Sequence, residues 1–195
     1  RRQGFRTAGV GKMGNDVSGR EVLSSLKVEG GSTGLMVGDA KFRAYNVALG
    51  DTRGEAIIHR SSSNPSASLL TMARLHKKLY PKSAVHTEEK IQVEKLDNLL
   101  KDAALEKPVL VKIDVQGFEE SVIRGGTKTI SGADIVLVEN SFVTLYEGQA
   151  LFGGIHDLLR GIGFSYRGRS ETHYNQKTGE PIYEDSVFIK ERPVA

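Results

Sequence analysis

The stretch VLVKIDVQGFEESVIRGG, residues 109–126, decides the fold. Its first five residues are typical of a buried strand, and Asp114 follows them directly. Gly117 supplies a turn, and two glutamates then open a short helix that we expect to end at Gly125-Gly126. Asp114 therefore stands at the carboxyl end of a predicted parallel strand, where open α/β sheets place their ligands. The alternative is an aspartate that only caps the helix.

The rest of the second half repeats strand and helix. We predict a strand over 135–138, a helix over 152–162, and strands over 164–167 and 186–190. The last two strands pair as an antiparallel hairpin around the turn signal Thr178-Gly179. This alternation predicts an α/β fold, namely a Rossmann-like, doubly wound, mostly parallel sheet with helices on both faces and a C-terminal antiparallel hairpin.

The first half carries weaker signals. Residues 45–49 and 55–59 alternate in polarity, and we read them as two strands that meet across the turn between them. Helical spacing from Leu69 to Tyr80 stops at Pro81, and a short strand over 90–93 precedes a short helix over 96–100. Nearer the start, Ser18 and Glu21 form a capping box that opens another predicted helix.

Length and composition restrict the class of protein. The chain has 195 residues, enough for one domain with a sizeable core. Its formal charge of +3 is small, and no stripe of aromatic and basic residues makes nucleic acid a good partner. There is no cysteine, which fits a reducing cytoplasm, and no apolar run approaches the roughly 20 residues of a membrane helix. A homo-oligomer stays open.

Several ordered motifs give the chain a family resemblance. They are YNVALGD at 45–51, SASL at 66–69, KIDVQGFE at 112–119, VE at 138–139, LYEGQ at 145–149 and GIGF at 161–164. In this order the chain resembles the FkbM family of S-adenosylmethionine-dependent methyltransferases, from about Phe42 onward. The resemblance implies the class I methyltransferase fold and O-methylation of a hydroxyl on a sugar, polyketide or similar small molecule.

The first quarter departs from this pattern. The family opens with a strand and the loop Asp-Val-Gly-Ala-Asn-x-Gly, which holds the methionine part of the cofactor, and neither this loop nor the acidic Phe-Glu-Pro segment occurs here. Residues 1–5 resemble the end of the helix that follows that loop. We therefore expect one domain over 1–195 that is incomplete at its N-terminus, with residues 1–41 divergent, residues 42–195 family-like and the central strand of the sheet missing.

A glycine motif offers a substitute for the missing loop. Residues 9–14 read GVGKMG, a G-x-G-x-x-G pattern that follows a weak strand at Phe5 to Ala8. A short strand at Leu35 to Val37 then leads to Asp39, where an acid would reach a ribose hydroxyl. This layout is typical of dinucleotide binding, but we favour a glycine-rich surface loop, because the helix cap lies several residues past the last glycine and the leading strand is short and polar.

Two carboxylates are the candidate catalytic residues. The resemblance places Asp114 beside the reactive end of the cofactor, where it orients the acceptor hydroxyl or takes its proton. Glu139 ends the next predicted strand and faces the same edge, so the two carboxylates would raise one pKa toward neutrality. A salt bridge from Glu139 to Lys112 is the structural alternative.

The remaining site residues follow from their loops. Ala48, Leu49 and Asp51 come after the strand expected to border the adenine pocket, so they are candidate cofactor ligands, as is Ser68. Their structural alternatives are a turn for the first three and a helix cap for the serine. Gln116, Tyr146 and Glu147 are candidate substrate-binding residues at the acceptor rim.

Three functions compete. The first is the S-adenosylmethionine-dependent methyltransferase, with a small-molecule acceptor and no resident metal. The second is a non-catalytic remnant of that fold, used in binding or assembly. The third is a nicotinamide-dependent oxidoreductase that uses the glycines from Gly9 to Gly14. In a minority variant of the first, the oxygen ligands of Asp114, Glu139 and Asn140 hold magnesium.

Overall fold

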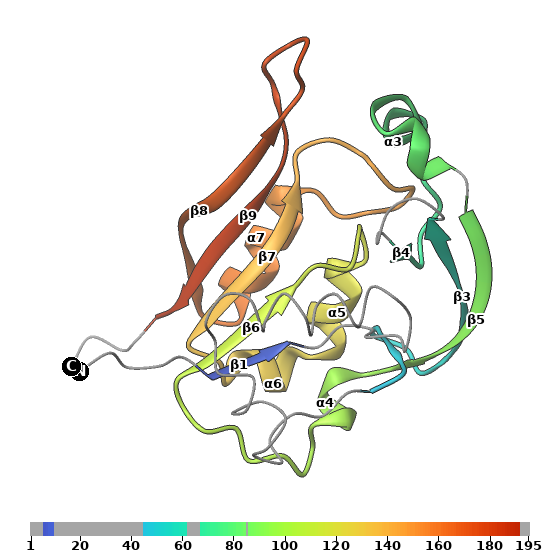
Figure 1. Cartoon of the computed structure of the whole chain (residues 1–195). Helices are drawn as coiled ribbons and strands as arrows, with labels where there is room; N and C mark the ends of the chain where they lie inside the picture. Colours follow the sequence, from blue (N-terminus) through green and yellow to red (C-terminus); the bar gives the residue numbers. More distant parts are fainter. Residues whose placement is uncertain (1–5, 10–44, 62–66, 85, 192–195) are drawn as a thin grey trace, which may run out of the picture.

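The computed structural model describes residues 6–9, 45–61, 67–84 and 86–191, and their strands form two separate sheets (Figure 1). The capping box at Ser18, the glycines from Gly11 to Gly14, Asp39 and Ser66 lie outside the described residues. Within the described residues, no helix is both long and apolar enough to span a bilayer.

The larger sheet has five strands in the spatial order β1-β6-β7-β9-β8. The first three are parallel to one another, and β9 and β8 run antiparallel. Their bounds are β1 Arg6–Gly9, β6 Val109–Ile113, β7 Ile135–Ser141, β8 Phe164–Tyr174 and β9 Pro181–Lys190. The β8–β9 hairpin rises above the rest of the sheet and turns at Gly179, whose φ of 73° suits glycine (Figure 1).

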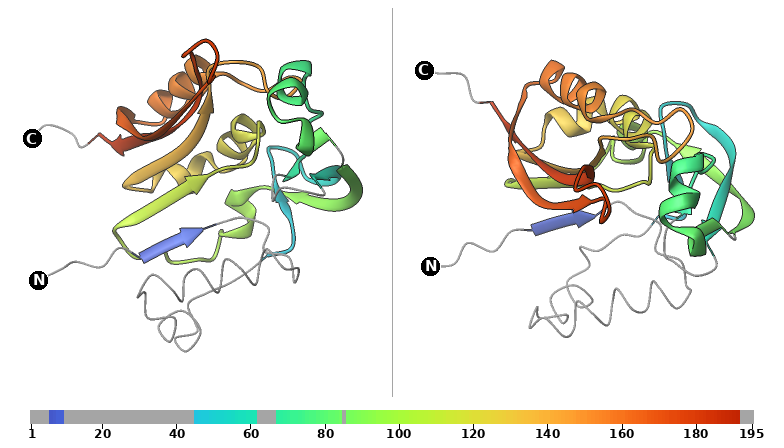
Figure 2. Two further views of the ribbon diagram at one scale, coloured as in Figure 1. Left: turned by 45° about the horizontal axis from the view of Figure 1, so that its top comes forward. Right: turned by 90° about the horizontal axis from the view of Figure 1, so that it is seen from above.

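Helices cover one face of this sheet. Both α5 (Glu119–Gly125) and α7 (Phe152–Gly161) lie on the same side of it (Figure 2), and α6 (Thr127–Ser131) follows α5 after Gly126. Strand and helix side chains meet in a core whose central members are at most 1% exposed: Ile123, Ile130, Val136, Val138, Ile155, Leu159, Phe164 and Phe188. This packing makes the helix-covered face the best-buried part of the described chain.

The smaller sheet has the order β2-β5-β3-β4. Its strands are β2 Ala48–Leu49, β3 Gly54–Ser61, β4 Ala67–Ser68 and β5 His86–Glu94. The short helix α3 (Arg74–Leu79) and the 3₁₀ turn η1 (Pro81–Ala84) lie between β4 and β5 in the chain, and α4 (Leu96–Leu99) follows β5.

The two sheets meet where α5 reaches the end of β2. A Cβ atom on Gly125 would lie 1.9 Å from the carbonyl oxygen of Gly50, which is far inside van der Waals contact. Gly125 therefore lets the helix touch the backbone of the loop after β2. The main-chain N–H of Gly50 donates to the carbonyl of Glu94 and fixes this loop to β5.

The α/β class and the C-terminal hairpin predicted from the sequence are confirmed. The sheets are mixed, however, and the described helices α5, α6 and α7 do not cover both faces of the larger one. The weak strand expected at Phe5 to Ala8 is present one residue later, as β1. It lies parallel to β6, so the position beside β6 is filled rather than empty.

Three local expectations were wrong. The strands β2 and β3 do not pair with each other, because β5 lies between them and pairs with both. The helix expected from Leu69 begins only at Arg74, and Met72 instead forms a β-bridge with Tyr146. Strand β7 extends to Ser141, so Glu139 lies inside the strand and not after it.

Candidate active site

Asp114 and Glu139 lie at neighbouring points of the larger sheet. Ile113 of β6 pairs in register with Val138 of β7, so the two carboxylate residues come next on adjacent parallel strands. The side chain of Asp114 is 36% exposed, and its Oδ2 lies 3.3 Å from Nζ of Lys112. Lys112 thus pairs with Asp114, rather than with Glu139 as the structural alternative supposed.

Gln116 joins the two carboxylates. Its Nε2 donates to Oδ1 of Asp114 at 3.0 Å and to Oε1 of Glu139 at 3.1 Å. Its Oε1 accepts from the hydroxyl of Tyr146 at 3.0 Å. The sequence-predicted catalytic pair and two of the predicted substrate-binding residues therefore form one hydrogen-bonded group.

The turn before α5 requires glycine at position 117. Gly117 has φ of 99°, and a Cβ atom there would lie 2.9 Å from Cβ of Tyr146. The tyrosine is only 2% exposed, because it packs directly on the main chain of this turn. A side chain at position 117 would push Tyr146 away from Gln116 and would also strain the backbone.

Glu119 closes the same turn from the inside. Its Oε1 accepts from the main-chain N–H groups of Val115 at 3.2 Å and Gly117 at 3.0 Å. The side chain is 4% exposed, and burial raises its pKa to about 7 against the opposing effect of these donors. From the sequence, Glu119 was predicted only as a residue of the first helical turn and not as a residue of the site.

Burial and negative charge keep a proton on Glu139. Burial is the main cause that raises its pKa to about 8, and the charges of Asp114, Glu119 and Asp185 add to it. Asp185 is its cross-strand partner on β9. For Lys112, burial is the largest single influence and lowers the pKa, but the charge and hydrogen bond of Asp114 and the charges of Asp185 and Glu139 together outweigh it, so the net pKa is raised. The site therefore holds a carboxyl group that titrates near neutral pH.

Three more aromatic residues lie on the β7–β9 side of this group. Tyr183 hydrogen-bonds Tyr80, and burial and the charge of Glu139 raise the pKa of both. The ring of His173 stacks on Tyr183 with centroids 4.3 Å apart. No local signal in the sequence pointed to these residues, because the hairpin and η1 bring them together from distant parts of the chain.

Ser68 supports the turn from the smaller sheet. Its hydroxyl donates to the carbonyl of Gln116 at 2.7 Å and accepts from the main-chain N–H of Leu70 at 3.0 Å. The side chain is 3% exposed, and its hydrogen bonds are made within the protein. The structure thus gives Ser68 a place beside the carboxylates, held against the turn of Gln116.

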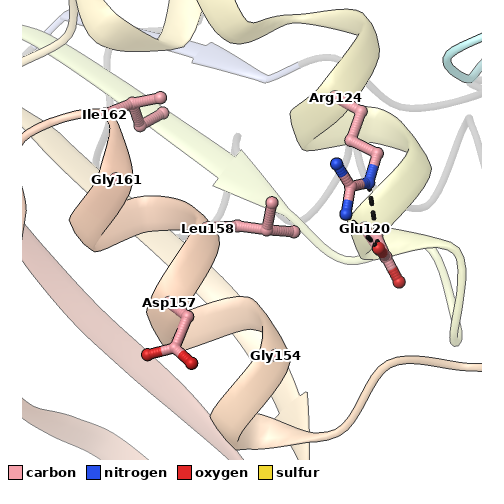
Figure 3. A pocket seen from close by; sticks show the side chains of 7 residues that line it. All are labelled: Glu120, Arg124, Gly154, Asp157, Leu158, Gly161 and Ile162. Carbon is pink, nitrogen blue, oxygen red and sulfur yellow. Dashed lines mark hydrogen bonds and ion pairs between the residues drawn. The ribbon is translucent and has the colours of Figure 1, made fainter.

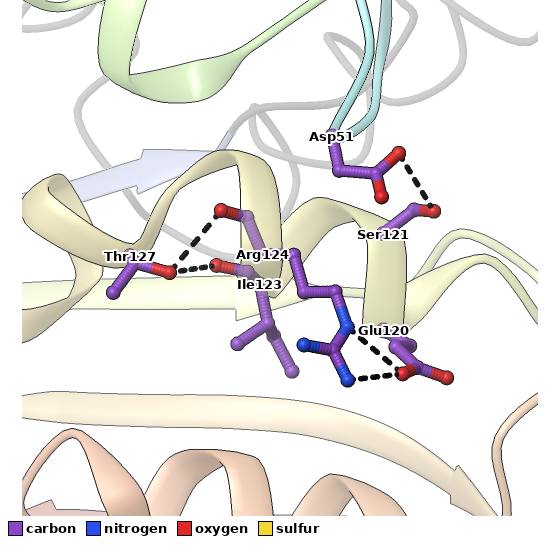
Figure 4. A network of polar contacts seen from close by, with 6 residues as sticks. All are labelled: Asp51, Glu120, Ser121, Ile123, Arg124 and Thr127. Atoms are coloured by element: carbon purple, nitrogen blue, oxygen red, sulfur yellow. Dashed lines mark hydrogen bonds and ion pairs between the residues drawn. The ribbon is translucent and has the colours of Figure 1, made fainter.

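The predicted cofactor ligands on β2 lie at the other side of α5. Leu49 is 8% exposed and belongs to the core, and Ala48 is half-buried beside it. Oδ1 of Asp51 accepts from the hydroxyl of Ser121 at 3.4 Å, at the start of α5 (Figure 4). No described hydrogen bond joins Asp51 to the group around Gln116.

Glu147 and Asn140 point elsewhere. Glu147 is exposed, and its main-chain N–H donates to the carbonyl of Thr71. Asn140 is 1% exposed, and neither polar atom of its amide has a hydrogen-bond partner among the residues that the structure describes. Because successive side chains of a strand face opposite sides, Asn140 points away from Glu139, and the suggested set of three magnesium ligands does not converge.

A hollow in the described surface lies away from these residues. It has a volume of about 460 Å³ and runs between α5 and α7 (Figure 3). Glu120 and Arg124 close one wall with an ion pair of 2.7 Å, and Leu158 and Ile162 form another. None of the residues proposed from the sequence as catalytic, cofactor-binding or substrate-binding lines this hollow.

The sequence was also compared with known proteins. The profile of the methyltransferase FkbM domain matches residues 31–166. The 2-O-methyltransferase NoeI of Sinorhizobium fredii (strain NBRC 101917 / NGR234) is 30% identical over 125 residues, which are 61% of this chain and 51% of NoeI. The chain thus spans about half the length of that relative, and no solved structure matches it. Since the family profile covers more than half of the sequence, the chain belongs to the FkbM methyltransferase domain family.

Proposed function

We propose that this chain is an S-adenosylmethionine-dependent O-methyltransferase that acts on a hydroxyl of a sugar, polyketide or similar small molecule. The observation that carries the proposal is the carboxylate pair of Asp114 and Glu139 on adjacent parallel strands, joined through Gln116. Membership of the FkbM family and the similarity to the 2-O-methyltransferase NoeI support methyl transfer.

The residues at this edge of the sheet fit S-adenosylmethionine as the cofactor. S-adenosylmethionine supplies a methyl group on a positively charged sulfur, and a carboxylate such as Asp114, which follows β6, attracts such a charge. Asp114 is partly exposed and could face it, while Ala48, Leu49 and Asp51 are the proposed residues on the adenine side. Strand β1 ends at Gly9 beside Lys112, which brings the start of the glycine motif to the same edge. We propose that this sheet is the doubly wound sheet of the class I fold.

The two carboxyl groups have different proposed roles toward the acceptor. We assign to Asp114 the orientation of the acceptor hydroxyl and to Glu139 the removal of its proton. A base must be ionised to act, and a pKa of about 8 means that Glu139 becomes competent as the pH rises through that value. The exposed Glu147 would contact the acceptor from the loop after β7, whereas Tyr146 is buried and its hydroxyl donates to Gln116. We further propose a cytoplasmic location, where S-adenosylmethionine is available, and leave a homo-oligomer as a possible assembly.

Titration with S-adenosylhomocysteine tests the first step. We expect saturable heat and a raised melting temperature at millimolar ligand or below. Binding of NAD(P) in place of this ligand would favour the oxidoreductase, and binding of neither would favour a non-catalytic role.

The second step is tested by transfer of a radioactive methyl group to a panel of sugars and polyhydroxylated compounds. The Asp114→Asn variant should lower the transfer rate by about 10²–10⁴-fold while ligand-free stability stays near that of the native chain. Glu55→Gln, an exposed carboxylate on β3, is the matched control and should leave the rate unchanged. Full activity of Asp114→Asn would contradict the assignment.

A further inference from the structure

The main chain around Gln116 is held on both sides. Residue 116 has φ of 55°, a left-handed conformation that is uncommon for a residue with a side chain. The Gly117 N–H is bound by Glu119, and the Gln116 carbonyl accepts from Ser68. Because the backbone is fixed in this way, the side chain of Gln116 is held in one direction.

The amide of Gln116 can be oriented in one way only. Its nitrogen contacts two carboxyl groups, which are acceptors, so the two N–H groups must face them. The oxygen then faces Tyr146, whose hydroxyl is a donor. Both donors and the acceptor are used within the protein, which leaves no N–H for an acceptor molecule. This differs from the substrate-binding role expected for Gln116 from the sequence.

We propose that Gln116 is a positioning residue that bridges Asp114 and Glu139 through one amide nitrogen and so holds the two candidate catalytic carboxyls at a fixed separation. Once Glu139 loses its proton, its charge and that of Asp114 repel each other, and each hydrogen bond donated by Gln116 offsets part of that repulsion. Tyr146 fixes the far end of the amide. Ser68 reaches the bridge from the smaller sheet through the main chain. The proposal deepens the function proposed above and rests on it.

The decisive measurement needs no acceptor and no cofactor. The carboxyl carbons of glutamate are labelled with ¹³C, and the Glu139 signal is assigned by its absence in Glu139→Gln. In Gln116→Met, which keeps the length of the side chain and removes the amide, we expect the Glu139 midpoint to rise by an amount equal to about 3- to 10-fold tighter proton binding.

A matched control makes the same change elsewhere. Gln92 lies on β5 and donates to the single carboxylate of Glu55 at 2.8 Å, on an exposed face. Gln92→Met should leave the Glu139 midpoint where it is in the native chain. A second variant, Gln116→Glu, replaces the donor by a third carboxylate and should raise the midpoint further than Met does. It also keeps the test available if the methionine variant does not fold.

The outcomes are separable. A raised Glu139 midpoint in a folded Gln116 variant, with none in Gln92→Met, supports the bridge. An unchanged midpoint in the folded Gln116 variants, or an equal shift in Gln92→Met, overturns it. Failure of the native chain to bind S-adenosylhomocysteine would instead overturn the proposed function. The two failures are distinguishable, because the Glu139 titration is measured without that ligand.

Discussion

The two sheets of this molecule differ in how deeply they are buried. Strands β7 and β9 of the larger sheet contribute Val136, Val138 and Phe188, each fully buried under the helices. In the smaller sheet, Ile58 is buried on β3 but its neighbour Ile57 is 40% exposed. The carboxylate pair stands on the well-buried sheet. The candidate catalytic pair is thus attached to strands of the more deeply buried sheet, while the smaller sheet supplies the hydrogen bond from Ser68 to Gln116.

The largest expected effect is a difference between the two sheets in how much free energy of unfolding a truncated side chain costs. Phe188→Ala removes a ring that is 0% exposed and should lower the free energy of unfolding by about 3–5 kcal/mol. Ile57→Ala removes a side chain that is already partly in water, so its cost should stay below about 1 kcal/mol. Urea unfolding followed by circular dichroism measures both. Equal losses would show that the smaller sheet is as firmly packed as the larger one.

A smaller effect should come from the junction between the sheets. Gly125→Ala places a methyl group against the carbonyl of Gly50, and rigid backbone on both sides cannot yield freely. We expect a loss of about 1–3 kcal/mol, typical of overpacking, and a weaker attachment of the smaller sheet.

Gly54→Ala is the control for this change, because a methyl group at Gly54, at the start of β3, meets nothing within 4 Å. Hydrogen exchange of β5 amides checks the attachment. Unaltered exchange in Gly125→Ala would mean that the junction does not hold the two sheets together.

The smallest effect should appear as a dependence of stability on pH. The pKa values of Glu119 and Glu139 are raised in the folded chain to about 7 and about 8, above the value near 4.3 of an unfolded glutamate. The folded state therefore binds more protons between these values, so their contribution is complete below about pH 4.3 and is lost as the pH rises to about 8.

We expect the free energy of unfolding to fall from pH 5 to pH 9, with a slope on the order of 1 kcal/mol per pH unit or less for each group. The melting temperature should fall with it. Glu139→Gln removes one of the two groups and should flatten the fall. Glu55→Gln, on the exposed face of β3, should leave it as it is. A native chain that is more stable at pH 9 than at pH 5, with the same slope in Glu139→Gln, would contradict these shifts.

The sequence predicted those parts whose signals are local. Strand β6 and helix α5 follow from an apolar run, a glycine turn and a helix start within 18 residues, and the β8–β9 hairpin follows from its turn signal. Strand β7 was predicted too short, because the apolar run ends at Val138. Its last residues are polar, since they include Glu139 and the buried Asn140.

The parts that failed depend on contacts between distant residues. The pairing of β5 between β2 and β3 joins strands that are far apart in the chain, and alternation in one strand does not reveal its partner. The bond from Ser68 to Gln116 spans 48 residues. The start of α3 was placed too early because Met72 satisfies helical spacing, whereas its contact with Tyr146 draws it into a bridge.

The place of Glu139 inside β7 has a consequence for how such an enzyme could diversify. Its main chain is paired with Asp185 of β9, and its strand is flanked by β6 on the other side. The hairpin tip near Gly179 and the helix α3 are, by contrast, attached at the margin of the molecule (Figure 1). Under the proposed function, substitutions at the hairpin tip that admit a different acceptor would leave these main-chain pairs of Glu139 in place.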